Sequence, residues 1–259
     1  MFKALHTAAT GMYAQQRNVE VVANNLANVN TTAYKRSDVV FADLLYVNER
    51  EPGAQTAAGG TMAGLQVGSG AAVIGTSKNF RQGDPIPTGN PFDLAIGGEG
   101  FFEVENPGGQ PLYTRAGNFS VDRDGVLTTP SGRRLVNGPS GLGNARNVTV
   151  TRDGRVSGLV DGVEADLGQI QIATFFNPAG LVAEGDNLYR ANEVSGAATL
   201  TNPEQNGAGS LLQEHLERSN VDIANELINL ILAQRAYETN SRAINTADQM
   251  MATANQVAR

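Results

Sequence analysis

The side chains that most often do chemistry are scarce in this sequence. His6 and His215 are its 2 histidines, and they stand near opposite ends of the chain. A metal cage or a histidine acid–base pair would have to be built from these two, so we expect both at solvent or interface positions instead. The chain has 0 cysteines, so no disulfide and no thiolate nucleophile is available. These counts argue against metal binding and against His- or Cys-dependent catalysis.

Three short stretches resemble chemical motifs but lack essential parts. The segment 122–125 (Asp-Arg-Asp-Gly) opens like a calcium loop, yet the later ligands and the closing glutamate are missing, and a β-turn explains it. The segments 68–70 (Gly-Ser-Gly) and 98–100 (Gly-Glu-Gly) lack the third glycine and the strand-to-helix context of a phosphate loop. We therefore predict that the protein is not an enzyme and that it has no catalytic residues, no cofactor and no metal.

Charge and hydropathy exclude two further classes of partner. The net charge is -7 and the lysines and arginines are dispersed, so we expect neither nucleic acid nor anionic lipid to bind. The most apolar run, 221–233, is shorter than the roughly 20 residues of a membrane span and carries Asp222 and Glu226. No membrane insertion is expected. The first 16 residues lack the continuous apolar core of a secretory signal, because threonines and glutamines interrupt it.

Any functional surface must then be carried by long helices at the two ends of the chain. Along 219–257, apolar residues recur with the seven-residue period of a coiled-coil seam. Ser219, followed by Asp222 three residues later, indicates a capping box at the helix start. The residues expected at a helix or subunit interface in this segment are Ile223, Leu227, Ile228, Leu230, Ile231, Tyr237, Ile244 and Met251.

Between 221 and 233 this helix has almost no polar face, and a helix that is apolar all round is normally buried on all sides. One partner helix cannot cover it. The pattern leaves two interpretations open: burial among several helices, some from other copies of the chain, or a helical hairpin that lies on its own domain.

The N-terminal segment repeats the same period and predicts a helix that stops near Asn30, within a cluster of asparagines. Gln15 is a polar break in the seam, of the kind that fixes register. The chain leaves the helical layer after the first helix and returns to it at the start of the second. The two terminal helices should therefore pair antiparallel. The interface residues expected in this segment are Leu5, Met12, Val19, Val22, Leu26 and Val29.

The middle of the chain predicts a different kind of structure. All 10 prolines and all but one of the 30 glycines lie between residues 52 and 209. Short runs of alternating apolar and polar residues indicate strands, as in 92–96 and 102–104, with a late strand at about 169–175. Hairpin-type dipeptides occur at Asp124-Gly125, Asn137-Gly138, Asp153-Gly154 and Asp161-Gly162.

The fold class is therefore α+β: long N- and C-terminal helices that pair as an antiparallel, coiled-coil-like inner domain, with a central, mainly antiparallel β domain. Segment 31–51 fits a short helix or an extended arm, and 52–75 is predicted to be a loop. The expected domains are 1–33 with 219–259 (helical), 34–75 with 206–218 (connecting) and 76–205 (outer β).

Three stretches, 8–37, 88–136 and 219–251, closely resemble the bacterial flagellar rod and hook family. They include AATGMYAQQRNVEVVANNLANVNTTAYKRS near the N-terminus, TGNPFDLAIGGEGFF in the middle and SNVDIANELINLILAQRAYETN near the C-terminus. The match covers both ends and much of the β domain, in the order of the family. Within the family, GLQVGSGA at 64–71 and the run 78–96 look most like the distal part of the rod, with proximal rod and hook subunits as the alternatives.

This resemblance implies a structural protein that polymerises helically with copies of itself into the rod, the hollow drive shaft that spans the periplasm in the flagellar basal body. It also implies export through the flagellar type III apparatus without a cleaved signal peptide. The implied partners are the proximal rod proteins, the hook protein and the surrounding periplasmic and outer-membrane rings. In such polymers the terminal helices form the inner tube and the β domain faces outward.

Two other classes of function remain as alternatives. A glycan-binding module would need an exposed aromatic cluster, and Phe101, Tyr113 and Phe175 are too scattered in the sequence to establish one. A glycan-cleaving enzyme would need two facing carboxylates, which the sequence alone cannot place.

Overall fold

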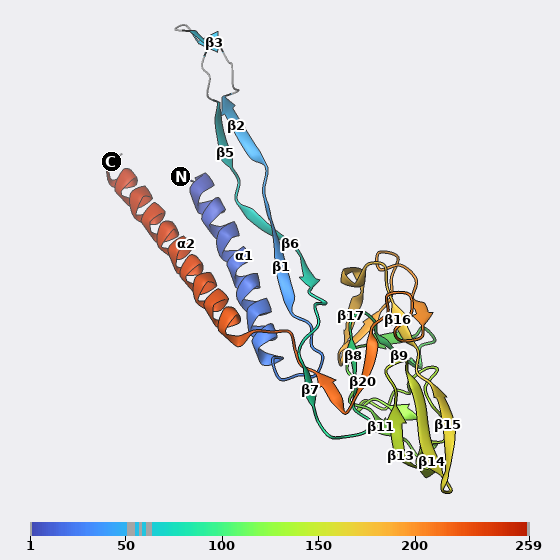
Figure 1. Cartoon of the computed structure of the whole chain (residues 1–259). Coiled ribbons are helices and arrows are strands. Elements are labelled where there is room, and N and C mark those ends of the chain that lie inside the picture. Colours follow the sequence, from blue (N-terminus) through green and yellow to red (C-terminus); the bar gives the residue numbers. More distant parts are fainter. Residues whose placement is uncertain (1, 51–54, 57–58, 61–63, 258–259) are drawn as a thin grey trace. The chain divides into compact units, whose positions relative to one another are not determined.

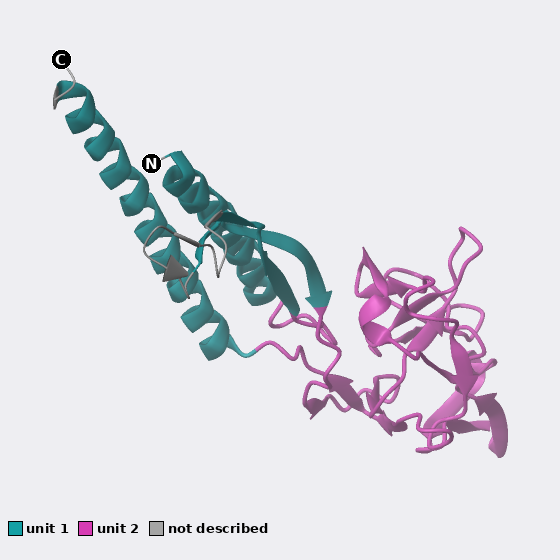
Figure 2. Cartoon of the chain, turned by 90° about the horizontal axis from the view of Figure 1, so that it is seen from above, with its two compact units in different colours: residues 1–27, 37–77, 222–259 teal, residues 28–36, 78–221 magenta. Residues whose placement is uncertain are grey.

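The structure, a computed structural model, describes residues 2–50, 55–56, 59–60 and 64–257. The chain divides into two compact units (Figure 2). Unit 1 comprises residues 1–27, 37–77 and 222–259, and unit 2 comprises residues 28–36 and 78–221.

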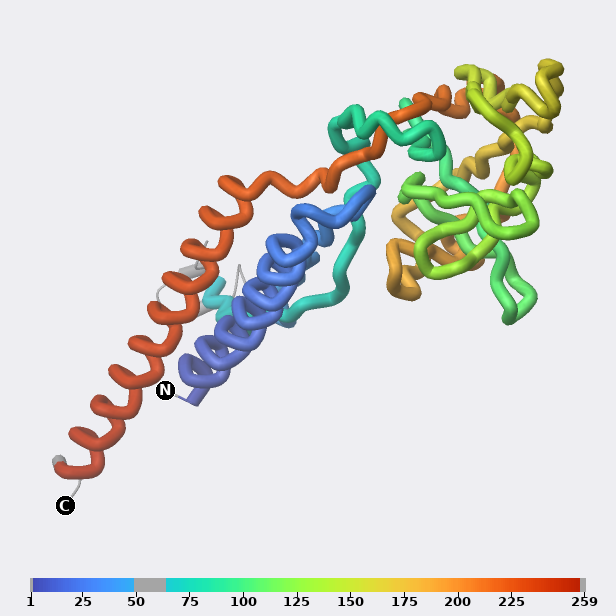
Figure 3. Tube along the Cα trace, turned by 90° about the horizontal axis from the view of Figure 1, so that it is seen from below, coloured from blue at the N-terminus to red at the C-terminus, as the bar shows by residue number. Residues whose placement is uncertain are grey.

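Unit 1 is built on the two terminal helices. Helix α1 spans Phe2–Ala27 and α2 spans Ile223–Val257. They lie side by side and antiparallel, so that the N- and C-termini are at the same end of the pair (Figures 1 and 3). Both sequences are free of proline and only Gly11 interrupts α1, which lets the helices run long. The predicted pairing of the terminal helices is confirmed.

Extended strands make up most of the other described residues of unit 1, so the extended arm is the correct interpretation for residues 37–50 of segment 31–51. The ladder β1–β6 continues into the antiparallel ladder β2–β5, in which Tyr46 lies opposite Gly68. The prediction of a loop over 52–75 is wrong for residues 55–56, 59–60, 65–68 and 71–75, which form strands. Residues 51–54, 57–58 and 61–63 lie outside the described residues. The strands are β1 Ser37–Asp43, β2 Tyr46–Arg50, β3 Gln55–Thr56, β4 Gly59–Gly60, β5 Leu65–Gly68 and β6 Ala71–Lys78.

Unit 2 is a β domain in which every described strand ladder is antiparallel, as predicted. A four-stranded sheet has the order β17-β18-β10-β9 and a three-stranded sheet the order β13-β14-β15, while β20–β8, β21–β7, β16–β19 and β11–β12 are pairs. The strands and 3-10 helices are β7 Pro85–Pro87, β8 Leu94–Gly97, β9 Phe102–Val104, β10 Leu112–Thr114, β11 Ser120–Val121, β12 Leu127–Thr128, η1 Leu142–Asn144, β13 Ala145–Val150, β14 Arg155–Val160, β15 Val163–Gln169, β16 Ile172–Thr174, η2 Pro178–Gly180, β17 Val182–Gly185, β18 Leu188–Arg190, β19 Thr199–Thr201, β20 Ser210–Gln213 and β21 His215–Glu217.

Three of the four predicted hairpin dipeptides connect paired strands. Asp124-Gly125 joins β11 to β12, Asp153-Gly154 joins β13 to β14, and Asp161-Gly162 joins β14 to β15. Asp161 and Gly162 have φ of 51° and 85°, the left-handed values of a type I′ turn. The prediction for Asn137-Gly138 is wrong, since the segment after it does not pair back on the segment before it.

The interior of unit 2 consists of two apolar clusters. The larger one includes Phe102, Val104 and Leu112, all with 0% exposure. The smaller one brings Phe101, Tyr113 and Phe175 together although they are far apart in sequence, with the Phe101 and Phe175 ring centroids 5.6 Å apart. All three rings are buried, so this cluster is part of the core and offers no exposed aromatic surface to a glycan.

Candidate functional site

The helix pair of unit 1 meets through small side chains. Ala14, Val22 and Ala233 are the buried apolar residues of α1 and α2. At one crossing the backbone of Gly11 approaches Asn240 so closely that a Cβ on Gly11 would lie 2.8 Å from the Asn240 side-chain nitrogen. Small contacts allow a close approach but remove little apolar surface from water. The pair is therefore weakly stabilised by its own contacts.

The structure separates the predicted interface residues into two groups. The first is buried or half-buried in the single chain: Leu5, Met12, Val19, Val22, Leu26, Val29, Leu230, Ile244 and Met251. The second is exposed on α2: Ile223 47%, Leu227 42%, Ile228 55%, Ile231 49% and Tyr237 44%. Val29 lies in unit 2, beyond the end of α1 at Ala27.

The exposed group defines an apolar surface on the first turns of α2. Ile223, Leu227, Ile228 and Ile231 are joined there by Leu232, which is 59% exposed. We call these five residues the α2 apolar face. The α2 apolar face thus exposes large apolar side chains of the kind that is usually buried in a folded protein. It is the part of the apolar run 221–233 that α1 does not cover.

The start of α2 differs from the prediction. The helix begins at Ile223, and the Asp222 carboxylate accepts hydrogen bonds from the backbone N–H of Ala224 at 2.9 Å and of Asn225 at 3.4 Å. Asp222 is therefore the N-cap, and the predicted capping box at Ser219 is wrong. The Ser219 hydroxyl instead accepts a bond from the Val221 N–H at 3.3 Å.

Asn25, near the end of α1, hydrogen-bonds to the extended arm that begins with β1. The sequence pattern indicated only that asparagines cluster where this helix ends. Asn25 is 1% exposed, and its amide nitrogen donates to the Ser37 carbonyl at 2.8 Å. The Ser37 N–H donates to the Asn25 amide oxygen at 2.9 Å. The side chain thus pairs with the first residue of β1 as a neighbouring strand would, and it fixes where the arm leaves the helix.

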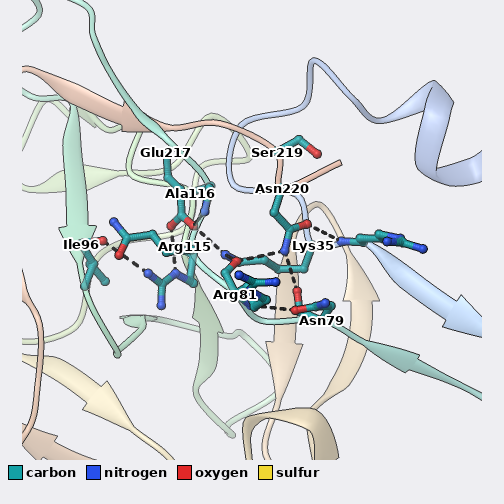
Figure 4. Close-up of polar contacts among 12 residues, drawn as sticks. Lys35, Asn79, Arg81, Ile96, Arg115, Ala116, Glu217, Ser219 and Asn220 are labelled. Carbon is teal, nitrogen blue, oxygen red and sulfur yellow. Dashed lines mark hydrogen bonds and ion pairs between the residues drawn. The ribbon is translucent and has the colours of Figure 1, made fainter. Parts of the chain in front are cut away.

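Unit 2 contains a buried ion cluster that sequence reasoning missed (Figure 4). The Glu217 carboxylate accepts hydrogen bonds from Lys35 Nζ at 2.6 Å, from the Gly83 N–H at 2.8 Å and from Arg115 Nε at 2.9 Å. The exposed fractions of the Lys35, Arg115 and Glu217 side chains are 0%, 3% and 1%. We refer to these three residues as the ion cluster.

The remaining donors of the ion cluster bind backbone carbonyls. Arg115 donates to the carbonyls of Gly98 at 2.8 Å and Gly100 at 3.1 Å, and Lys35 donates to the carbonyl of Arg81 at 2.8 Å. Burial and the neighbouring Arg115 charge lower the pKa of Lys35 to about 8, against the opposing attraction of Glu217. Two cations therefore share one carboxylate in an enclosed site, where their further bonds to backbone carbonyls offset part of the cost of burial.

Asn220 extends these contacts to the chain segments on either side. Its amide nitrogen donates to the carbonyls of Asn79 at 2.7 Å and Arg81 at 2.9 Å, and its amide oxygen accepts from the Arg36 N–H at 2.8 Å. Together with the ion cluster, Asn220 binds segments 33–36, 79–83 and 217–220. These segments adjoin three of the places where the chain passes from one unit to the other.

The described residues offer no other chemical centre of the kinds considered. His6 is exposed and His215 is half-buried, with its Nδ1 2.7 Å from the Gln213 carbonyl oxygen. Among the described residues, no group of three or more His, Asp or Glu side chains is arranged to hold a metal ion. In the same part of the chain, neither helix is long and apolar enough to cross a membrane.

Comparisons with known proteins agree with the helices and strands described above. Residues 5–35 match the family model for flagella basal body rod proteins, residues 95–158 the D1 domain of the flagellar hook protein FlgE/F/G, and residues 212–257 the C-terminal part of flagellar basal body rod FlgEFG proteins.

Two proteins named flagellar basal-body rod protein FlgG match almost the whole chain. The one from Caulobacter vibrioides is 45% identical over 98% of this chain and 99% of its own length. The one from Buchnera aphidicola is 42% identical over 97% of this chain and 98% of its own length. The FlgF rod protein of Caulobacter vibrioides is 34% identical over 96% of this chain and 95% of its own length. With full-length identity of this degree, the chain belongs to the FlgG family of flagellar basal-body rod proteins, which are structural proteins and not enzymes.

Proposed function

We propose that copies of this chain polymerise helically into the distal rod, the hollow drive shaft that carries torque from the motor to the hook. The observation that carries the proposal is the α2 apolar face, whose five large side chains stay exposed in the single chain. Covering the exposed half of each isoleucine or leucine would stabilise an assembly by about 1 kcal/mol per side chain. A helical polymer supplies that cover in every copy.

In this proposal α1 and α2 form the inner tube and unit 2 faces outward. The alternative of a helical hairpin that packs only on its own domain would leave the α2 apolar face in water. A place in the proximal rod or the hook is the other alternative. The higher identity to the FlgG protein than to the FlgF protein of the same organism, 45% against 34%, favours the distal rod.

The ion cluster supports a role in bearing force. The chain passes between the units at four places, between residues 27 and 28, 36 and 37, 77 and 78, and 221 and 222. Force that passes along the polypeptide from one unit to the other crosses these places. The enclosed, charge-assisted hydrogen bonds of Glu217 and the neutral amide hydrogen bonds of Asn220 hold the segments next to three of them at defined positions.

Besides copies of itself, the proposed partners are the proximal rod proteins, the hook protein and the periplasmic and outer-membrane rings around the rod. We also propose export by the flagellar type III apparatus without a cleaved signal. Mass spectrometry of the subunit from purified basal bodies tests the last point. An N-terminal peptide that still contains residues 2–16 is expected, and a subunit that begins beyond them would contradict it.

Polymerisation is tested by Ile231→Asp, with Gln234→Asp as the matched control. Both positions are exposed on α2, so neither substitution removes a buried contact within one chain, but only Ile231 belongs to the α2 apolar face. We expect electron micrographs of the concentrated protein to show tubes for the wild type and for Gln234→Asp, and none for Ile231→Asp. Tubes of normal length from Ile231→Asp would show that this face remains in solvent in the polymer.

A further inference from the structure

A glutamate in unit 2 has a carboxylate oxygen without a partner. Glu103 lies on β9 between Phe102 and Val104, whose side chains fill the larger core cluster. Strand alternation places Glu103 on the opposite face, where its cross-strand neighbour is Tyr113. The residue is only 9% exposed, and within the described part of the chain its Oε2 atom is enclosed and accepts no hydrogen bond. Burial raises the pKa of Glu103.

Glu103 lines a cleft of about 690 Å³ in unit 2. Tight turns form its rim: the Gly109 N–H donates to the Asn106 carbonyl at 2.9 Å, and the Gly132 N–H donates to the Thr129 carbonyl at 2.8 Å. A third wall comes from the β17–β18 turn, where Asp186 has φ 51°. Arg133 Nη1 links two of the turns by donating to the Asn106 amide oxygen at 3.2 Å. The cleft is therefore formed before any ligand enters.

The charges around the cleft favour a positively charged ligand. Glu103, Glu105 and Asp186 all line it. Arg134 also lines it, but its guanidinium is ion-paired with Asp122 at 3.0 Å and with Asp124. The positive charge of Arg134 is thus already balanced by carboxylates. Arg133 also lines the cleft and offsets one of its three carboxylates, so an excess of negative charge remains. Neither of these described arginines donates to Glu103 Oε2.

We propose that this cleft binds a lysine or arginine side chain presented by a partner protein, with Glu103 as the negatively charged group at its base. An enclosed carboxylate is costly, and an ammonium or guanidinium group in the cleft would offset its charge together with the charges of Glu105 and Asp186. A neutral hydroxyl, as on a glycan, would leave the excess negative charge of the cleft unbalanced. The inference is independent of the proposed polymer.

The test uses the full chain at a concentration where sedimentation shows single subunits. The probe is the peptide acetyl-Gly-Arg-Gly-amide, and its control is the same peptide with citrulline, which keeps the shape of arginine without the charge. We expect saturable binding of the arginine peptide by titration calorimetry, at least tenfold weaker binding of the citrulline peptide, and a similar loss in Glu103→Gln. Glu164→Gln, at an exposed position on β15 that does not line the cleft, should bind as the wild type does.

A second cleft variant and a glycan probe complete the experiment. Asp186→Asn, at the rim of the cleft, should weaken binding several-fold even if Glu103→Gln fails to fold by circular dichroism. Chitotetraose serves as the glycan probe. Absent or non-saturable binding of the arginine peptide, equal binding of the citrulline peptide, unchanged binding in both cleft variants, or saturable binding of chitotetraose alone would each overturn the proposal.

Discussion

The two units bury their side chains in opposite ways. In unit 2, large residues such as Phe101, Phe102 and Leu112 are almost fully enclosed. In unit 1 the buried apolar residues are small, and the large ones of the α2 apolar face remain exposed. Ordering a backbone costs about 1 to 2 kcal/mol per residue, which large enclosed side chains can offset and small ones cannot. We therefore expect unit 2 to be stable alone and unit 1 to depend on neighbouring copies in the proposed polymer.

Amide hydrogen exchange gives the largest expected difference between the units. In the dilute single chain, the strands of unit 2 should be protected by a factor on the order of 10⁴ or more, as for a stable domain. Both terminal helices should exchange almost as fast as an unfolded chain and become protected only on polymerisation. Slow exchange across both 5–29 and 221–254, where sedimentation shows a single subunit, would mean that unit 1 is self-sufficient.

Breaking the ion cluster should be the most damaging single substitution in unit 2. Glu217→Gln leaves the enclosed charges of Lys35 and Arg115 without their carboxylate, so the free energy of unfolding of unit 2 should fall by about 3 to 5 kcal/mol. The measurement is urea denaturation followed by circular dichroism. The control is Glu184→Gln, which removes the exposed ion pair with Arg190 and should cost less than about 1 kcal/mol. Equal small losses in both variants would mean that the enclosed pairs stabilise no more than surface pairs.

The same substitution, leucine to alanine, can be compared between an enclosed site in unit 2 and an exposed site in unit 1. Leu112→Ala empties a fully enclosed site in unit 2 and should cost about 2 to 5 kcal/mol in the single chain. Leu227→Ala removes the same atoms from an exposed site on α2, so we expect a loss below about 1 kcal/mol in the single chain but a higher critical concentration for tube formation. A large loss of single-chain stability in Leu227→Ala, measured by the same denaturation, would show that unit 1 has a core of its own.

Features set by nearby residues were predictable from the sequence, and features set by distant residues were not. The long helices follow from a sustained seven-residue period, and three hairpins follow from dipeptides that favour left-handed backbone. The helix start was misplaced because Ser219 and Asp222 are both good N-caps, and only the hydrogen bonds show that Asp222 has this role.

The ion cluster could not be found in this way. Glu217 is separated from Lys35 by 182 residues and from Arg115 by 102, so no local pattern connects them. A lysine, an arginine and a glutamate normally indicate solvent-exposed positions. The sequence indicated only part of the environment of Glu103, which stands between the apolar Phe102 and Val104. Strand alternation predicts on which face of the sheet the Glu103 side chain lies, but it does not predict the cleft that this side chain lines.

The pH dependence of unit 2 tests how the charges of the ion cluster are balanced. The pKa of Lys35 is about 8 in the folded chain, because burial and Arg115 disfavour its charge more than Glu217 favours it. The ordinary pKa of a lysine is 10.5, so between pH 8 and pH 10.5 more of the unfolded chain than of the folded chain carries this proton. The stability that depends on Lys35 should therefore rise with pH across this window and be lost as the pH falls back through about 8.

Lys35→Met, which keeps much of the length of the side chain and cannot titrate, isolates this contribution from the other lysines and the tyrosines that titrate in the same range. The quantity to follow is the free energy of unfolding of the wild type minus that of Lys35→Met, from urea denaturation at several pH values. It should be level below pH 8, rise up to about pH 10.5 and then level off. A difference that falls with pH instead would mean that the attraction of Glu217 outweighs burial and Arg115, and that Lys35 keeps its charge because the pair is worth more than the desolvation it costs.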